Sequence, residues 1–299
     1  MARAGGRDIG SVAVFTAMVT PFLADGALDA DGAGRLAAWL TAHGSEGLVL
    51  GGTTGEGPTL SVDERHRLFD AVRAAVPEVP LFVSTGHNST ATTVEWTAWA
   101  EAWGADGAMV VTPYYNKPPQ AGLAAHFSAV AAATRLPLML YNVPSRTGVH
   151  LAVETTLGLM ARHENVWAVK EASGAVQHAA ALAARMPPGR RVFTGEDALL
   201  LPSLQVGAHG VVSVASHVAG PEITSLIAHA AAGRLAAAWA LADRLAPVIA
   251  ALFSVSNPIP VKGLLNRRGL PAGPPRLPLV PASAAELAEW ERVLAAAGL

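Results

Sequence analysis

The segment NVWAVKEASG, residues 165–174, joins a short apolar run to a polar turn. The run Val166–Val169 has the length and composition of a buried β-strand, and Lys170 follows it directly. Seven similar apolar runs occur along the chain, and alanine-rich stretches with helical character, such as 63–75 and 90–103, lie between them. The eight predicted strands are Val12–Met18, Gly47–Leu50, Leu81–Ser84, Gly107–Val111, Pro137–Leu140, Val166–Val169, Arg191–Thr194 and Gly210–Val214.

The spacing of these runs decides between two α/β folds. The strands begin roughly 20 to 35 residues apart, which is the size of one βα unit. Eight such units favour a (β/α)8 TIM barrel. A doubly wound sheet is the alternative, but it usually carries a G-x-G-x-x-G turn after its first strand, and that spacing is absent here.

The strand pattern stops after Gly220. The stretch Glu222–Leu252 is helical in character, a proline-rich segment follows it, and Ala284–Ala297 predicts a last helix. We therefore expect the barrel over residues 1–220. Residues 221–299 are predicted to form a C-terminal helical extension packed on the barrel.

Composition excludes several classes of function. The chain has 299 residues, no cysteine and a formal net charge of −2. A chain of this length buries enough surface to fold without cross-links. Without cysteine there are no disulfides, no thiolate catalysis and no cysteine-ligated metal. The ten histidines form no H-E-x-x-H pair, so no metal site is expected. The sequence has no stripe of basic residues, so nucleic acid is not an expected partner.

Two apolar segments resemble membrane signals. Ala198–Pro221 has no charged side chain, but its glutamine, histidines, prolines and glycines are more typical of a packed core. The first 22 residues combine arginines with an apolar run, as signal peptides do. Thr16, Thr20 and Pro21 interrupt that run, which suits a first strand better. We expect a cytoplasmic protein that does not associate with membranes.

Polar side chains follow the predicted strands, at the end of a TIM barrel where active sites lie. All three tyrosines of the chain are among them, which points to a site at this rim. The candidates are Thr53, Thr54, Glu56, Tyr114, Tyr115, Asn116, Lys117, Tyr141, Asn142, Arg146, Lys170, Glu171, Gly195, Glu196 and Asp197.

Most of these candidates also have an ordinary structural interpretation. The segment GGTTGEG, residues 51–57, is either a glycine-rich turn or a cradle of N–H and hydroxyl groups for a carboxylate or phosphate. Arg146 is either a surface ion-pair residue or a clamp for a substrate carboxylate. The tyrosines are core aromatics or, beside an ordering hydroxyl such as that of Thr54, proton-transfer groups.

Lys170 is the most informative candidate. Burying an unpaired ammonium group is unfavourable, so a buried lysine either pairs with a carboxylate or loses its proton. Pairing with Glu171 or a distant carboxylate is the structural interpretation. The functional interpretation is a neutral amine that attacks a ketone and forms a Schiff base. The residues alone leave both open.

Seven motifs occur in order across nearly the whole chain: GGTTGEGPTLS, VVTPYYNKP, YNVPSRTG, VKEASG, TGED, HGVVSV and NPIPVK. Together they resemble the dihydrodipicolinate synthases, also called 4-hydroxy-tetrahydrodipicolinate synthases, which are class I aldolases related to the N-acetylneuraminate lyases. The resemblance implies a (β/α)8 barrel with a C-terminal helical part, usually assembled as a homotetramer of two tight dimers. It implies a lyase, without cofactor, that condenses pyruvate with L-aspartate 4-semialdehyde to 4-hydroxy-tetrahydrodipicolinate, in diaminopimelate and lysine biosynthesis.

The resemblance also assigns catalytic roles by motif. Lys170 would form the Schiff base with pyruvate, and Tyr141 would be the acid–base group above it. Thr54 and Tyr115 would complete a proton relay, with Tyr115 reaching across the dimer interface from the neighbouring subunit. Thr53 would order that relay.

The substrate-binding roles follow from the same resemblance. The backbone at Thr53 and Thr54 would hold the pyruvate carboxylate, and Gly195 and Val212 would line the pocket. Arg146 would bind the carboxylate of the semialdehyde. Its presence favours the synthases over sialic acid and sugar-acid lyases, which generally lack it. An aldolase or dehydratase of a 2-keto-3-deoxy sugar acid stays an alternative. A non-catalytic binding paralogue is another, which the intact lysine, tyrosines and arginine disfavour.

One departure from the family pattern concerns regulation. Lysine-inhibited members carry histidines on the helix after TTGE and a glutamate after the TGxN segment. This chain has Val62 and Arg65 on that helix and Thr92 in the expected place of the glutamate, while Asn88 and Tyr114 remain. We expect inhibition by lysine to be weak or absent.

Overall fold

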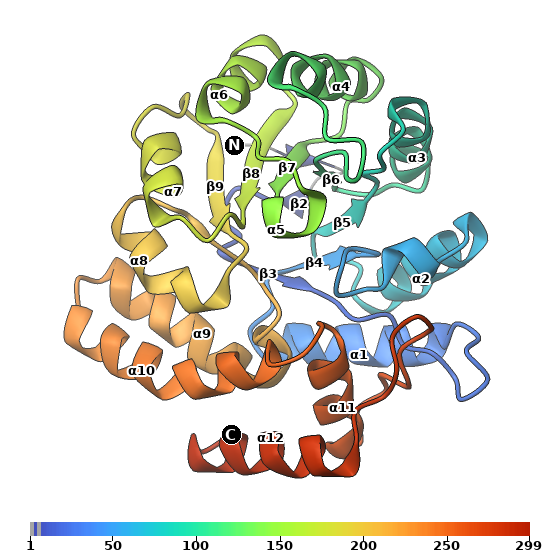
Figure 1. The fold of residues 1–299 in the computed structure, drawn as a ribbon, viewed down its shortest axis with the longest axis vertical. Helices are drawn as coiled ribbons and strands as arrows, with labels where there is room; N and C mark the ends of the chain where they lie inside the picture. Colours follow the sequence, from blue (N-terminus) through green and yellow to red (C-terminus); the bar gives the residue numbers. More distant parts are fainter. Residues whose placement is uncertain (1–2, 5–6) are drawn as a thin grey trace. The chain divides into compact units, whose positions relative to one another are not determined.

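The computed structural model describes residues 3–4 and 7–299 (Figure 1). Eight strands form a closed barrel in the order β10-β3-β4-β5-β6-β7-β8-β9, which confirms the predicted TIM barrel. A two-stranded antiparallel sheet of β1 (Arg3–Ala4) and β2 (Arg7–Asp8) precedes the barrel. The barrel strands are Val14–Ala17 (β3), Gly47–Leu50 (β4), Leu81–Ser84 (β5), Gly107–Val111 (β6), Leu138–Asn142 (β7), Val166–Glu171 (β8), Arg191–Thr194 (β9) and Gly210–Ser213 (β10).

The chain divides by its contacts into two compact units. The first unit contains Met1–Ala13 and Pro80–Val212, and the second contains Val14–Val79 and Ser213–Leu299. The boundary predicted at residues 220 and 221 separates barrel from extension and stays a prediction. Residues 1–2 and 5–6 of the predicted barrel domain lie outside the described residues.

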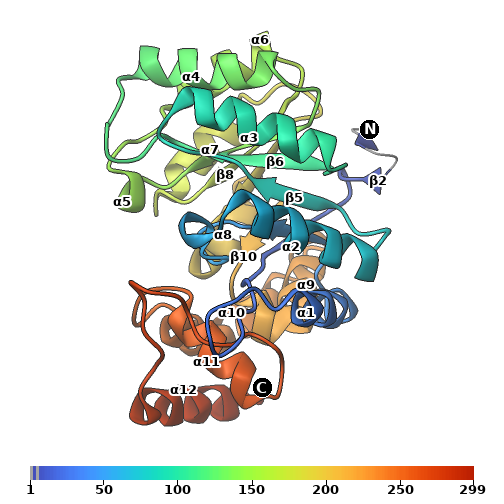
Figure 2. The same ribbon diagram turned by 90° about the vertical axis from the view of Figure 1, so that its right-hand side faces the viewer.

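In the first unit, α3, α4, α6, α7 and α8 follow one another around the outer side of β5 to β9, whereas the short α5 does not belong to this layer (Figure 1). Helices α3 and α4 lie side by side, and α4 also packs against α6 (Figure 2). Every residue of β7 and β8 is buried, as expected for parallel strands covered on both faces. The helices are Thr90–Ala102 (α3), Gln120–Ala132 (α4), Pro144–Thr147 (α5), Val153–Arg162 (α6), Val176–Ala183 (α7) and Leu200–Gln205 (α8), with the 3₁₀ turn Asp197–Leu199 (η2).

In the second unit, β3 and β4 pair in parallel and α1 packs against α2. Helix α2 begins with a capping box between Ser61 and Glu64, and α12 begins with the same motif at Ser283 and Glu286. The helices are Ala30–Ala42 (α1), Val62–Ala75 (α2), Ser216–Ala231 (α9), Leu235–Leu252 (α10), Ile259–Arg267 (α11) and Ala284–Ala296 (α12), with the 3₁₀ turn Gly57–Thr59 (η1).

The structure corrects several predicted boundaries. Strands β7 and β8 continue to Asn142 and Glu171, so Tyr141 and Lys170 lie within strands rather than after them. The predicted helix Glu222–Leu252 is two helices, α9 and α10, because Gly233 between them has a left-handed φ of 71°. The proline-rich segment contains α11, whose proline stands in the first turn, where it disrupts no hydrogen bond.

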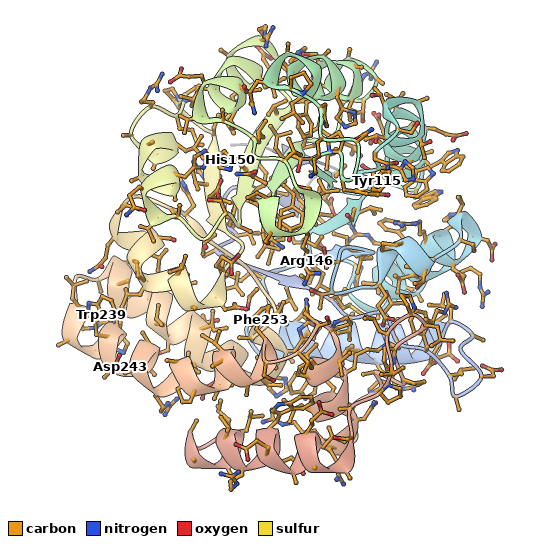
Figure 3. All side chains as sticks on the ribbon, viewed as in Figure 1. Tyr115, Arg146, His150, Trp239, Asp243 and Phe253 are labelled. Carbon is orange, nitrogen blue, oxygen red and sulfur yellow. The ribbon has the colours of Figure 1, made fainter. Side chains whose placement is uncertain are left out.

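Helix α10 is long and apolar enough to cross a membrane, by length and composition alone. It packs against α9 and α12 within the second unit and buries one side there, with a third of the helix buried in all. Its outer side includes Trp239 and Asp243, and Phe253 follows its end (Figure 3).

Candidate active site

Lys170 and Tyr141 stand side by side on neighbouring strands. They are register partners of β8 and β7, and the Lys170 Nζ lies 4.2 Å from the centre of the Tyr141 ring. Both side chains are buried, with 5% and 6% exposure. The structure therefore brings together the predicted nucleophile and the predicted acid–base phenol within the first unit.

Glu171 is not the partner of Lys170. Its carboxylate accepts hydrogen bonds from the Asn142 amide at 2.9 Å and the Ser173 backbone N–H at 2.8 Å, and lies 2.7 Å from His178 Nδ1. Burial raises the pKa of Glu171, but the hydrogen bonds from these three groups together have a larger opposite effect. The pKa of Glu171 is therefore below its usual value. Within the described part of the chain, neither Lys170 nor Arg146 forms an ion pair.

Gly195 lies directly against the lysine. A Cβ atom at Gly195 would stand 2.7 Å from Lys170 Cε, which is closer than real Cβ atoms approach. The Gly195 N–H also donates to the Glu171 carbonyl at 2.7 Å, which fixes the chain after β9. Glycine at this position thus provides the space that the Lys170 side chain occupies. Val212, the other predicted lining residue, is fully buried on β10, the neighbour of β9.

Tyr115 and Arg146 are exposed on the loops that follow β6 and β7 (Figure 3). Tyr115 is 89% exposed and has a left-handed φ of 74°, which is uncommon for a residue with a side chain. Its backbone N–H donates to the Thr147 carbonyl at 3.4 Å, so the two loops are joined. Arg146 belongs to the short helix α5 and is exposed.

Two groups of titratable residues in this unit received no role from the sequence. Burial, followed by the charge of Asp197, raises the pKa of Glu196, while the charges of Lys170 and Arg146 act in the opposite direction. A carboxyl group with a raised pKa among cations is a frequent feature of active sites. The His150 ring lies 4.5 Å from the His178 ring, and burial and His178 lower the pKa of His150. Nothing in the sequence pattern pairs these histidines.

The second unit contains the glycine-rich loop with Thr53 and Thr54. Gly57 permits a tight turn, since a Cβ there would lie 2.1 Å from the Gly51 carbonyl oxygen. Thr54 is 2% exposed, whereas Thr53 is partly exposed. Among the described residues, the backbone N–H groups of Thr53 and Thr54 donate to no backbone acceptor. The geometry of the loop thus supports the predicted anion cradle.

A buried ion pair supports this loop, and sequence reasoning missed it. Lys262 Nζ lies 2.7 Å from Glu56 Oε1, and the two side chains are 1% and 3% exposed. Lys262 also donates to the carbonyls of Thr20 and Pro274, both at 2.9 Å. Burial lowers the pKa of Lys262 to about 8, although Glu56 acts to raise it. The motif NPIPVK contains Lys262, but a motif does not reveal a partner 206 residues away.

No cluster of three or more metal-ligating side chains occurs among residues 3–4 and 7–299.

Comparisons with known proteins agree on one family. Residues 11–297 match the model described as the dihydrodipicolinate synthetase family. A 4-hydroxy-tetrahydrodipicolinate synthase from Moorella thermoacetica is 50% identical over 287 residues, which cover 96% of this chain and 98% of the relative. One from Thermosynechococcus vestitus is 49% identical over 288 residues, covering 96% and 97%.

Solved structures agree with this. The crystal structure of DHDPS from Cyanidioschyzon merolae with lysine bound has a TM-score of 0.95 and 41% identity, and covers 98% of this chain and 100% of that one. The dihydrodipicolinate synthase from Thermotoga maritima has a TM-score of 0.93 and 38% identity, and covers 96% and 98%.

Proposed function

The chain belongs to the dihydrodipicolinate synthetase family, and we propose that it condenses pyruvate with L-aspartate 4-semialdehyde to form 4-hydroxy-tetrahydrodipicolinate. One observation carries the proposal from family to chemistry. Lys170 is buried beside a phenol, and within the described residues no carboxylate pairs with it. An amine in such surroundings is suited to act as a nucleophile rather than as half of an ion pair.

In the proposed reaction, the Lys170 amine attacks the ketone carbon of pyruvate and water leaves, which forms an iminium ion. The iminium withdraws electrons, so the methyl group of pyruvate loses a proton and becomes an enamine. The enamine carbon then bonds to the aldehyde carbon of the semialdehyde, the aldehyde oxygen takes up a proton, and the Lys170 iminium is re-formed. The amino group of the semialdehyde finally attacks the iminium carbon, and the bond from that carbon to Lys170 breaks, which closes the ring and releases the lysine amine. Tyr141 lies next to the Lys170 Nζ. From there its phenol can take part in removing the proton from the methyl group of pyruvate and in delivering a proton to the aldehyde oxygen.

The proposed proton relay continues from Tyr141 through Thr54 to Tyr115, and Thr53 orders it. We propose that Tyr115 serves the site of a neighbouring subunit, in a homotetramer built as a dimer of dimers. The 89% exposure of Tyr115 is compatible with this role, since it leaves the phenol accessible to a neighbouring subunit.

Both substrates carry a carboxylate, and the chain offers one anion site for each. We assign the pyruvate carboxylate to the backbone N–H groups of Thr53 and Thr54, with Gly195 and Val212 lining the pocket. We assign the carboxylate of the semialdehyde to Arg146, whose guanidinium is exposed and has no ion-pair partner in the described residues. The reaction as proposed needs no metal or organic cofactor, nucleic acid or membrane, and we place the protein in the cytoplasm.

Reductive trapping tests the proposal. The protein is incubated with pyruvate and borohydride, and the modified residue is mapped by mass spectrometry. The sequence has three lysines, Lys117, Lys170 and Lys262, so the assignment is simple. We expect an adduct on Lys170, none in Lys170→Arg, and full trapping in the matched exposed-lysine control Lys117→Arg. No adduct on Lys170 would refute the Schiff base.

A coupled assay then identifies the second substrate. Turnover with L-aspartate 4-semialdehyde and none with 2-keto-3-deoxy sugar acids supports the synthase. In Arg146→Ala we expect a higher KM for the semialdehyde and unchanged trapping of pyruvate. The reverse substrate preference would assign the chain to the sugar-acid aldolases.

A further inference from the structure

Asn257 contacts the glycine-rich loop, although it is far from the loop in the sequence. It lies just before α11 and is 7% exposed. Its side-chain Nδ2 donates to Thr54 Oγ1 at 2.9 Å, across 203 residues of sequence. Its Oδ1 is buried and has no hydrogen-bond partner among the described residues. Burying an amide oxygen without a hydrogen-bond partner is unfavourable, so the presence of Asn257 at this position needs an explanation.

The same segment fastens the loop at a second point. Five residues after Asn257, Lys262 pairs with Glu56 at 2.7 Å. Asn257 and Lys262 therefore hold Thr54 and Glu56, the residues on either side of Gly55.

Two further side chains complete the fastening. The Thr20 hydroxyl donates to the Gly55 carbonyl at 2.6 Å, and the Arg65 guanidinium donates to the Gly57 carbonyl. Each residue from 54 to 57 is thus held through a side chain or a carbonyl. The N–H groups of Thr53 and Thr54, in contrast, donate to no backbone acceptor in the described part of the chain. A loop that is fixed while its donors are left free is preorganised to bind an anion.

We propose that Asn257 is a positioning residue for pyruvate: it holds Thr54 so that the N–H groups of Thr53 and Thr54 converge on the substrate carboxylate. Asn257 acts through Thr54 and takes no part in proton transfer or bond formation. This inference rests on the proposed function, because it assigns the occupant of the cradle. It predicts that loss of the Asn257–Thr54 hydrogen bond weakens pyruvate binding while the fold is retained.

The experiment measures the pyruvate concentration that gives half-maximal borohydride trapping on Lys170. Pyruvate is the only probe, so the second substrate is irrelevant. Wild type is measured first: without an adduct the proposed function itself fails, and the variants are not compared. In Asn257→Ala we expect the half-saturating concentration to rise by about 2- to 10-fold, the effect of losing one neutral hydrogen bond. Ser256→Ala, an exposed neighbour, is the matched control and should equal wild type.

A double-mutant cycle separates positioning from a general structural role. In a Thr54→Val background the Asn257→Ala change should have no further effect, because the bond is already absent. In a Thr54→Ser background, which keeps the hydroxyl, its full effect should return. An unchanged half-saturating concentration in Asn257→Ala, or an equal effect in both backgrounds, would overturn the proposal. If Asn257→Ala does not fold, Asn257→Ser enters the same cycle with the same criteria.

Discussion

Tyr141 and Lys170 are register partners in the barrel, and the lysine nitrogen lies 4.2 Å from the centre of the tyrosine ring. A rigid parallel ladder holds both residues, so their separation is set by the sheet rather than by a flexible loop. The ring packs against the amine, and the hydroxyl extends beyond the ring. A substitution that removes only the hydroxyl therefore separates the packing of the Tyr141 ring from the chemistry of its phenol.

Tyr141→Phe is expected to keep the ring contact and remove only the hydroxyl. We expect kcat to fall by roughly 10²- to 10⁴-fold, the usual contribution of a general acid–base group. The Schiff base should still form, so borohydride trapping with pyruvate and the thermal midpoint should stay near wild type. A variant with normal turnover would remove Tyr141 from the mechanism.

Gly195→Ala tests the space around the nucleophile. The added Cβ would meet Lys170 Cε at 2.7 Å and displace it. Since a displacement of about 1 Å can reduce turnover on the order of 100-fold, we expect a loss of this size in kcat/KM. The matched control is Gly158→Ala on α6, where the new Cβ meets only Arg162 at 3.8 Å and should stabilise the helix by about 1 kcal/mol. Equal activity in both variants would contradict the prediction.

The barrel was predictable from sequence because its buried parallel strands are apolar runs separated by helical stretches. The ends of β7 and β8 were not, because Tyr141, Asn142, Lys170 and Glu171 are polar and look like loop residues. They face a site or a hydrogen-bond network instead of solvent. Helix α11 was concealed by Pro258 directly before it and by Pro260 in its first turn, where proline is tolerated.

For the candidate site, the sequence yields a prediction of which residues carry chemistry, but not of the residues that support them. Lys170 and Tyr141 were predictable from their strand positions and motifs. The bond between Asn257 and Thr54 joins residues 203 positions apart, and no periodicity encodes such a pair. The same holds for Glu56 and Lys262, because only the fold brings them together.

His217 predicts acid sensitivity of the fold. It is fully buried, and burial lowers its pKa to about 4, although the hydrogen bond to the Val214 carbonyl acts in the opposite direction. Between pH 6.5 and 4 the unfolded chain binds a proton at this residue that the folded chain does not. The free energy of unfolding should therefore fall as the pH falls, by about 2 kcal/mol between pH 7 and pH 5.

Urea denaturation at the two pH values measures this loss. His217→Gln can accept from the Val19 N–H and donate to the Val214 carbonyl, as the histidine does, but does not titrate. Its unfolding free energy should depend less on pH than that of wild type. His66→Gln, at an exposed position, is the control and should keep the full dependence. Parallel pH profiles for wild type and His217→Gln would show that another group is responsible.

Because Lys262 and Glu56 form a buried ion pair, we expect removal of the lysine alone to destabilise the fold more than removal of both charges. Lys262→Met leaves the Glu56 carboxylate buried without its ion-pair partner and should reduce the free energy of unfolding by about 3–5 kcal/mol. Adding Glu56→Gln removes the uncompensated charge and should recover part of that loss. The exposed pair of Arg267 and Glu291 is the control, and Arg267→Met should change stability by about 0–1 kcal/mol. Similar losses in the two single variants would contradict the importance of burial.

Feedback by lysine should be weak in this chain, although a relative from Cyanidioschyzon merolae that is 41% identical has been crystallised with lysine bound. A carboxylate forms the strongest hydrogen bonds with the side-chain ammonium of lysine, but the expected position carries Thr92, an uncharged residue on α3. Arg65, in place of a histidine on α2, is buried and donates to the Gly57 carbonyl, so it serves the loop.

Titration of the condensation assay with L-lysine should therefore show little inhibition below the millimolar range. Thr92→Glu restores a carboxylate and should increase the sensitivity to lysine, whereas Thr92→Gln has nearly the same shape without the charge and should not. Strong inhibition of the wild type at sub-millimolar lysine would mean that the ammonium group is bound by residues other than those at the expected position. Equal sensitivity of the two variants would show that charge at residue 92 does not determine inhibition.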